Sequence, residues 1–203
     1  MTVEQIRVGS DNFSYLIHSG KGTKAALVDP GFDTSGILRS IEDLTVILKV
    51  IIATHHHSDH TAGIHEIKKE TGALIVASEE DGSRIAGGVD VTVKDGEVLN
   101  LGGNRIEILK TPGHTPGGIC LIVDNEFLIT GDTMFINDCG RCDLPGGSLE
   151  DMYDSLQRIK DLPDDLMVLP GHDYGPKPRD RLGNQKTANF TMNVNSLEEF
   201  SKL

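Results

Sequence analysis

The stretch Thr54-His55-His56-His57-Ser58-Asp59-His60 is the most informative part of this sequence for its fold and its chemistry. It follows the nearly continuous apolar, β-branched run 46–53, which predicts a fully buried strand. It precedes a helical pattern over 62–70, for which Gly72 is the expected C-terminal stop. The stretch is therefore predicted to be a loop at the carboxyl end of a strand, where mixed sheets commonly place ligand sites.

Within this loop the spacing H-x-H-x-D-H suits metal ligands. His55 and His57 can point to the same side of an extended backbone, because side chains alternate along it. Asp59 and His60 lie where the chain turns into the helix, and they can face a second ion. Imidazole suits zinc and iron, and a carboxylate can bridge two ions. His56 is the expected spacer, pointing away from the metals.

Three more polar residues follow predicted apolar strands, namely His114, Asp132 and His172. A glycine stands immediately before each of them, and glycine allows close approach of the backbone at such turns. Several strand ends that deliver His or Asp to one edge predict a single metal centre. Isolated histidines such as His18 and His65 are assigned no role.

The rest of the chain mixes strands and helices without strict βα alternation. Strands are expected at 3–8, 13–18, 24–29, 73–77, 89–93, 105–109, 118–123, 126–130 and 166–169, and further helices at 34–44 and 149–159. Mostly antiparallel sheets with outer helices fit this order better than a parallel doubly wound sheet. No repeat or composition shift marks a second domain, so a single domain over 1–203 is expected, with 175–203 as its irregular C-terminal tail.

Composition restricts the partners and the compartment. The net charge of −12 disfavours nucleic acid and anionic lipid surfaces as partners. No apolar run reaches the ~20 residues that span a bilayer, and no signal-peptide pattern opens the chain. Three cysteines are too few for a disulfide framework, so a reducing, cytoplasmic setting is expected. The final Ser201-Lys202-Leu203 matches a peroxisomal address, which has meaning only in a host with peroxisomes. The oligomeric state stays open.

Five stretches carry a resemblance to a known family: THHHSDH, TPGHTPG, GDT, GRCDLPGGS and LPGHDYG. They resemble the metallo-β-lactamase superfamily, and most closely its glyoxalase II (hydroxyacylglutathione hydrolase) branch, from the first strands to about Tyr174. The resemblance implies an α/β (α+β) fold, a four-layer αββα sandwich of two mixed, mostly antiparallel sheets with outer helices. It also implies two divalent metal ions at one edge between the sheets, zinc in the first place and iron as the alternative.

The resemblance gives each residue of the set a role. His55, His57 and His114 would hold one metal; Asp59, His60 and His172 would hold the other; and Asp132 would bridge the two. Asp59 and Asp132 are thereby the candidate catalytic carboxylates.

The resemblance also implies two substrate contacts. Arg141 and Tyr174 match positions that face the glutathione moiety in glyoxalase II. The alternatives are a surface ion pair of Arg141 with Asp143 and a packing role for Tyr174. The sequence ends before the extra helical region of glyoxalase II, and the stretch 185–190 departs from the signature of the short relatives. Both departures leave the thiol carrier open.

The expected function is metal-dependent hydrolysis of a small-molecule thioester, such as S-lactoylglutathione or an analogue, by a metal-bound hydroxide. The first alternative is a mononuclear Fe(II) persulfide dioxygenase, because His55, His114 and Asp132 alone form a two-histidine, one-carboxylate set. A remote alternative is a non-catalytic metal-binding module. Cys139 and Cys142 have the spacing of a redox dithiol, but they do not open a helix after a thioredoxin-like strand, so no redox function is expected.

Overall fold

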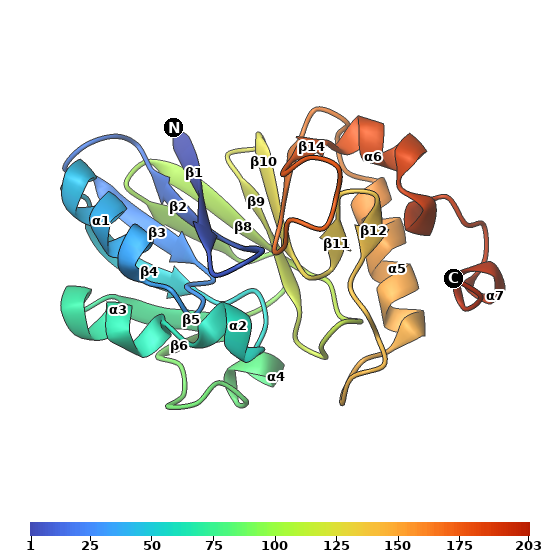
Figure 1. The fold of residues 1–203 in the computed structure, drawn as a ribbon, viewed down its shortest axis with the longest axis horizontal. Helices are drawn as coiled ribbons and strands as arrows, with labels where there is room; N and C mark the ends of the chain where they lie inside the picture. The colour runs from blue at the N-terminus through green and yellow to red at the C-terminus, as the bar shows by residue number, and fades with distance from the viewer.

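The computed structural model of the chain describes residues 1–203 and contains two six-stranded sheets, each with helices on its outer side (Figure 1). The first sheet has the order β1(Thr2–Val8), β2(Asn12–His18), β3(Lys24–Val28), β4(Ile47–Ile52), β5(Leu74–Ser78), β6(Val91–Val93). The second has the order β14(Asp180–Arg181), β13(Met167–Pro170), β10(Phe127–Gly131), β9(Ile119–Val123), β8(Asn104–Lys110), β7(Val98–Leu101). A small hairpin joins β11(Met134–Phe135) to β12(Asp138–Cys139).

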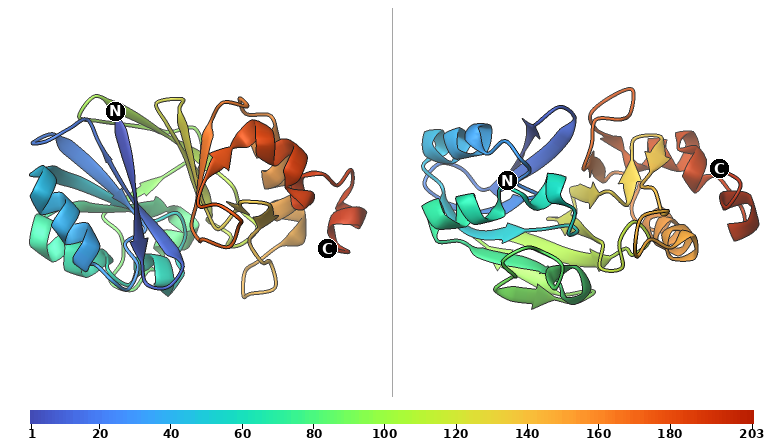
Figure 2. Two further views of the ribbon diagram at one scale, coloured as in Figure 1. Left: turned by 45° about the horizontal axis from the view of Figure 1, so that its top comes forward. Right: turned by 60° about the horizontal axis from the view of Figure 1, so that its bottom comes forward.

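The helices divide between the two outer faces (Figures 1 and 2). The first sheet carries α1(Ser35–Leu44), α2(Ser58–Thr61), α3(Ile64–Thr71) and α4(Glu79–Gly82), and beside the second lie α5(Leu149–Lys160), α6(Leu182–Ala188), the 3-10 helix η1(Phe190–Met192) and α7(Leu197–Phe200). Three separate apolar clusters fill the spaces between the layers. One lies between the two sheets, one between the first sheet and α1 and α3, and one between the second sheet and α5 and α6. This arrangement confirms the expected four-layer αββα sandwich.

Strand β9 shows why these sequences form buried strands. Ile119, Leu121 and Val123 belong to the cluster between the sheets, whereas Cys120 and Ile122 belong to the cluster under α5. Because successive side chains of a strand point to opposite faces, a strand with apolar layers on both sides must be apolar at every position. The turn that follows β9 places Asp124 and Asn125 at positive φ, as a tight hairpin requires.

The pairing is mixed in both sheets, and its distribution differs from the expectation in one respect. In the second sheet only β10 and β13 pair in parallel. In the first sheet the pairs from β3 to β6 are all parallel, because helices cross between these strands. Mostly antiparallel pairing therefore describes the second sheet, and the first sheet contains a βαβ series that the sequence pattern did not reveal.

Two local expectations are wrong. The strand β4 is not fully buried, because Ile47 is 51% exposed and Lys49 is also exposed at the uncovered beginning of the strand. The segment 175–203 is not an irregular tail, since it contains β14, α6, η1 and α7. Leu182 of α6 and Phe200 of α7 are buried in the cluster under α5, and this burial orders a segment that is rich in polar residues.

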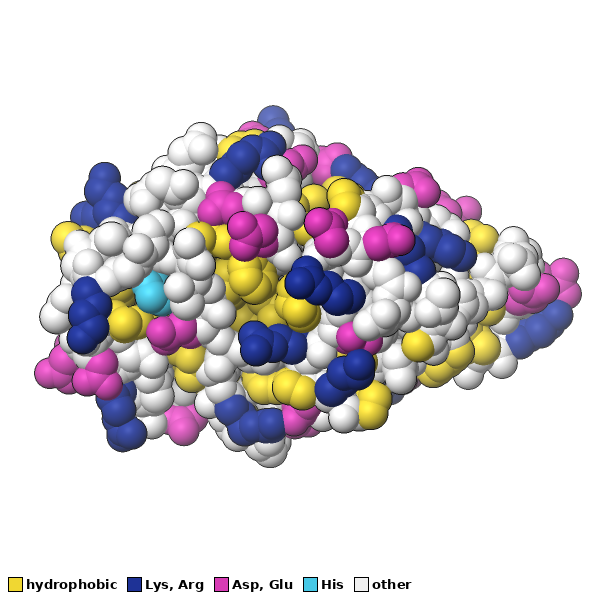
Figure 3. Space-filling view, turned by 90° about the horizontal axis from the view of Figure 1, so that it is seen from above, with side chains coloured by type: hydrophobic (Ala, Val, Ile, Leu, Met, Phe, Trp, Pro, Cys, Tyr) yellow, Lys and Arg dark blue, Asp and Glu magenta, His cyan; other side chains and the backbone are white.

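The surface at the end of the sandwich where β1 begins carries no single charge sign. Figure 3 shows apolar side chains in a hollow there, with Lys and Arg around it and acidic side chains nearby. None of the helices has the length and apolar composition that crossing a membrane requires.

Candidate metal centre

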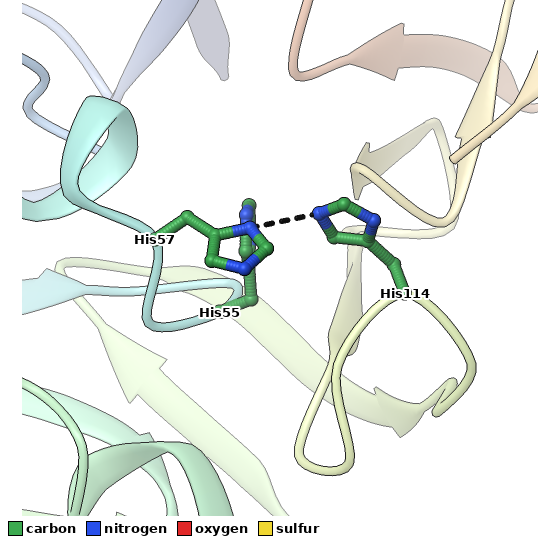
Figure 4. Close-up of side chains that lie close together, drawn as sticks. All are labelled: His55, His57 and His114. Carbon is green, nitrogen blue, oxygen red and sulfur yellow. Dashed lines mark hydrogen bonds between the residues drawn. The ribbon is translucent and has the colours of Figure 1, made fainter. Parts of the chain in front are cut away.

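The predicted ligands meet at one place, because each follows the end of a strand. The stretch 54–60 leaves β4 as a loop and continues into α2, which holds Asp59 and His60. His114 lies between β8 and β9, Asp132 follows β10, and His172 follows β13. These strands come from both sheets, so the centre lies where the edges of the two sheets face each other. Figure 4 shows His55 and His57 approaching His114 from the opposite side of this junction.

His55, His57 and His114 form the first group. Nδ1 of His57 lies 2.9 Å from Nε2 of His114. The three ligand atoms of the group lie within 4.8 Å of one another, and His55 and His114 are buried. Three imidazole nitrogens at this spacing can face one ion.

Asp59, His60 and His172 form the second group, with the same mutual limit of 4.8 Å. Nε2 of His60 lies 3.1 Å from Nε2 of His172. Oδ2 of Asp59 lies 3.4 Å from the His60 nitrogen and 3.3 Å from the His172 nitrogen. These three atoms can face a second ion.

Asp132 lies between the two groups. Its Oδ1 is 3.3 Å from Nε2 of His60, and its Oδ2 is 3.3 Å from Nε2 of His172. Oδ2 is also 3.6 Å from Nε2 of His114, which belongs to the first group. A carboxylate in this position can contact both ions at once.

Two observations show that the residues fit bound cations. Nε2 of His55 and Oδ1 of Asp132 are buried without any hydrogen-bond partner, although buried polar atoms are normally satisfied. Burial opposes charge on Asp132, but the neighbouring His60 and the hydrogen bond from His172 outweigh it and lower the pKa of the carboxyl well below its usual value. Burial lowers the pKa of His55 and of His57, whereas at His60 and His172 the carboxylates of Asp132 and Asp59 outweigh burial and raise the pKa, to about 9 for His172. Ionised carboxylates and neutral imidazoles are the forms that bind metals.

Buried hydrogen bonds orient two of the ligand histidines. Nδ1 of His60 lies 3.1 Å from Oδ2 of Asp29, and Nδ1 of His114 lies 2.7 Å from the carbonyl oxygen of Arg141. When each Nδ1–H donates to its oxygen, Nε2 is left free to bind metal. Asp29 also accepts from the amide and the hydroxyl of Thr54, at 2.7 and 2.6 Å, which fixes the start of the ligand loop.

Asp29, Asn12 and Asp81 are residues that the sequence analysis missed. Asp29 follows an apolar strand, as Asp132 does, so the same signal could have found it. Asn12 donates from Nδ2 to Oδ2 of Asp59 at 3.0 Å. Nothing in the local sequence marks that contact, because it joins β2 to the distant helix α2.

Asp81 ties together the two loops that carry the first ligand group. Its side chain is fully buried, and its carboxylate accepts from the His56 amide at 3.0 Å and from the Thr115 hydroxyl at 2.7 Å. It also accepts from the Gly117 amide at 2.9 Å. Nδ1 of His56 lies 3.1 Å from the same carboxylate, and the His56 ring also packs against the His57 ring, with 4.8 Å between the ring centroids.

Gly171 allows the strand end beside His172 to approach Asp132. A Cβ atom at position 171 would collide with Oδ1 of Asp132 and lie 2.9 Å from Cε1 of His60. Any other residue would therefore displace the Asp132 carboxylate or the backbone.

The two predicted substrate contacts lie at the mouth of the centre. A pocket of about 230 Å³ is lined by residues that include His114, Asp132, Arg141 and Tyr174. The Tyr174 ring stacks on His172 at 4.6 Å and is 57% exposed, and its burial on one side raises its pKa to about 12. Arg141 forms a two-point ion pair with Asp143 at 2.6 and 2.7 Å, with both side chains more than half exposed.

Comparisons with known proteins identify the class of protein to which this fold and these candidate metal ligands belong. The pattern of the Metallo-beta-lactamase superfamily matches residues 8–172, so the chain belongs to this superfamily. It is 38% identical to a "Hydroxyacylglutathione hydrolase" of Methylococcus capsulatus over 175 residues, which cover 86% of this chain and 67% of that protein. These findings confirm the glyoxalase II-like resemblance and indicate a hydrolase.

Two further similarities span almost the whole chain. The "Probable polyketide biosynthesis zinc-dependent hydrolase PksB" of Bacillus subtilis is 32% identical, over 96% of this chain and 87% of that protein. The crystal structure of ETHE1 from Myxococcus xanthus superposes with a TM-score of 0.90 at 30% identity, covering 98% of this chain and 88% of that one. The similarity to this structure extends through the C-terminal helices that the sequence pattern did not predict.

Proposed function

We propose that this protein is a two-metal thioester hydrolase of the glyoxalase II-like type, with zinc as its metal. The observation that carries the proposal is Asp132, whose two oxygens lie within 3.6 Å of histidines from both ligand groups. The names of its relatives, a hydroxyacylglutathione hydrolase and a zinc-dependent hydrolase, support the reaction type and the metal.

The reaction would exchange one bond for another at the acyl carbon. A C–O bond forms from water and the C–S bond breaks, so a carboxylic acid and a thiol are released without any change of oxidation state. Two bound ions would supply Lewis acidity and a water of lowered pKa. A thiolate is a good leaving group, since a free thiol has a pKa of about 8.5, and no separate strong acid is needed.

The chain's own residues would position the reactants. Asp59 would accept a hydrogen bond from the attacking water, because its carboxylate is about one-third exposed. Asp132 would hold the two ligand groups at a fixed separation. The carbonyl carbon would lie in the 230 Å³ mouth, with Arg141 and Tyr174 beside the thiol carrier.

Thiol release from S-lactoylglutathione, followed with a chromogenic disulfide, tests the proposal. We expect metal-dependent release that His114→Asn abolishes together with metal binding. His65→Asn is the matched control, because His65 is an exposed histidine that belongs to neither ligand group and whose ring contacts the Ala86 carbonyl.

Two results would overturn the proposal. One is the absence of thiol release from any thioester at any metal loading. The other is oxygen uptake with glutathione persulfide and no thioester cleavage, which would favour the dioxygenase alternative.

A further inference from the structure

The largest cavity of the protein lies beside the metal centre, and none of the candidate metal ligands lines it. Its volume is about 680 Å³, which is within the range of pockets that bind small molecules. One wall is the segment 138–143, and the opposite wall comes from α5, η1 and α7 together with the chain end. Leu149, Phe190, Phe200 and Leu203 supply its large apolar side chains.

This cavity adjoins the mouth of the metal centre. Asp138, Cys139 and Arg141 line both spaces, so one short segment of chain separates the ligand residues from the apolar walls. The backbone of the same segment holds the centre, because the Arg141 carbonyl accepts the hydrogen bond from His114. A molecule whose reacting carbon lies at Asp132 can therefore extend into the cavity.

The charges in the cavity disfavour an anionic occupant. Asp138 and Asp143 are its acidic lining residues, and Arg141 is its only basic one. The Arg141 guanidinium is paired with Asp143 through Nε and Nη2. Carboxylates or phosphates of a thiol carrier would meet net negative charge there, whereas the aliphatic and aromatic walls favour hydrocarbon.

Three of the apolar residues that line the cavity are exposed to solvent in the free protein. Leu149 is 47%, Phe190 50% and Leu203 64% exposed. Scattered apolar side chains are ordinary on a surface, but these three border one cavity next to the reaction centre. Burying them against a substrate would be favourable, because apolar surface leaves water.

We propose that this cavity binds the acyl group of the substrate and that the enzyme prefers thioesters with medium-length aliphatic or aromatic acyl groups over lactoyl or acetyl thioesters. The inference rests on the proposed function, since the carbonyl must be at the metal centre. The carrier thiol then leaves on the solvent side, past Arg141 and Tyr174.

The test is a series of acetyl, butyryl, hexanoyl and octanoyl thioesters of one small uncharged thiol, assayed with the metal-loaded enzyme. We expect kcat/KM to rise about three- to fourfold for each methylene that enters the cavity, and to level off once the chain outgrows it. The carrier is kept constant, so the increase reports the acyl group alone.

Leu149→Asp is the cavity variant, and Leu74→Asp is its matched control. Both residues begin an element, and they are 47% and 48% exposed, but Leu74 lies on the first sheet away from the cavity. Leu149→Asp should lower kcat/KM for the octanoyl ester at least tenfold and leave the acetyl ester nearly unchanged. Leu74→Asp should change neither. If Leu149→Asp folds poorly, Phe190→Ala tests the same wall.

The outcomes separate the two proposals. Equal kcat/KM across the acyl series, with hydrolysis of every member, would overturn the acyl assignment and leave the hydrolase proposal standing. In a companion series with one acyl group and thiols of increasing apolar size, a steep rise of kcat/KM, without a trend in the acyl series, would also overturn it. Failure to hydrolyse any member would overturn both proposals.

Discussion

The Asp29 carboxylate holds the His60 ring, because Oδ2 of Asp29 lies 3.1 Å from Nδ1 of His60 and both side chains are buried. The same oxygen accepts from the Thr54 hydroxyl at 2.6 Å. One residue at the end of β3 therefore sets both the start of the ligand loop and the orientation of a ligand on its far end.

Asp29→Asn should weaken metal binding without removing a ligand. The amide keeps the size of the side chain but loses the charge that supports His60, and the loss of such a partner typically costs ten- to a hundredfold in affinity. Competition with a chromogenic chelator measures the effect. Asp33→Asn is the control, since Asp33 is exposed and caps only the start of α1. Unchanged affinity for both ions in Asp29→Asn would show that His60 needs no such support.

Gly171→Ala should disrupt the centre, whereas Gly36→Ala should not. A Cβ atom at 171 collides with Oδ1 of Asp132, but at 36 it meets only Ile6 at an ordinary 3.6 Å inside α1. We expect Gly171→Ala to lower metal content and to cost about 1–3 kcal/mol of stability by overpacking. Gly36→Ala should be neutral or more stable by up to about 1 kcal/mol. Thermal unfolding and metal analysis of both variants check this, and normal metal content in Gly171→Ala would count against the geometry of the bridge.

Arg141→Ala tests the contact with the thiol carrier. A charge-assisted contact is worth ~1.5–3 kcal/mol, so kcat/KM for an anionic carrier should fall about ten- to a hundredfold, with the loss in KM and metal content intact. Asp143→Asn should raise kcat/KM for the same carrier, because it frees the guanidinium with which Asp143 is paired. If neither variant changes the kinetics, Arg141 has only its surface ion pair.

The cysteines beside the cavity should react slowly at neutral pH. Burial raises the pKa of Cys139 to about 12 and that of Cys142 to about 11. Since the thiolate is the reactive form, alkylation by iodoacetamide should be slow at pH 7.5 and rise about tenfold per pH unit toward pH 11. Mass spectrometry of timed samples measures the rate. Rapid modification of either thiol at pH 7.5 would contradict this and reopen a redox role.

The fold was largely predictable where periodicity was strong, as in β9 and α5. Side chains of β9 alternate between two apolar layers, and Ser148 is the N-cap of α5, where its side chain accepts from the Asp151 amide. The edge strand β7 was not predicted, because it is only half-buried and carries a weak apolar pattern. The helix α6 is polar in sequence and is ordered by tertiary contacts such as the burial of Leu182.

In the candidate site too, residues within a local sequence pattern were predictable, and residues that act through tertiary contacts were not. The predicted ligands lie just after strands or, for Asp59 and His60, in the short helix α2 that follows one, and the structure brings all of them together. Asn12 and Asp81 were not predictable, because their contacts cross between elements 25 to 47 residues apart and leave no local pattern. The acyl cavity depends on how the C-terminal helices fold back beside 138–143, which no spacing rule reveals.

Asp132→Ala should affect both ions, unlike the loss of a ligand from one group. Removing the bridge takes away the carboxylate that lies near His114 on one side and His172 on the other. We expect a protein that binds no metal, or one ion weakly, with no thiol release. Two tightly held ions in Asp132→Ala would show that Asp132 does not bridge them.

Metal stoichiometry of the wild-type protein, purified without chelator or added metal, tests the central claim most directly. Elemental analysis against protein concentration gives the number and kind of ions in each chain. The two ligand groups joined by Asp132 predict two ions per chain, roughly 3.5–4 Å apart, with zinc as the main element. A single iron ion per chain in a fully active protein would contradict the two-metal hydrolase.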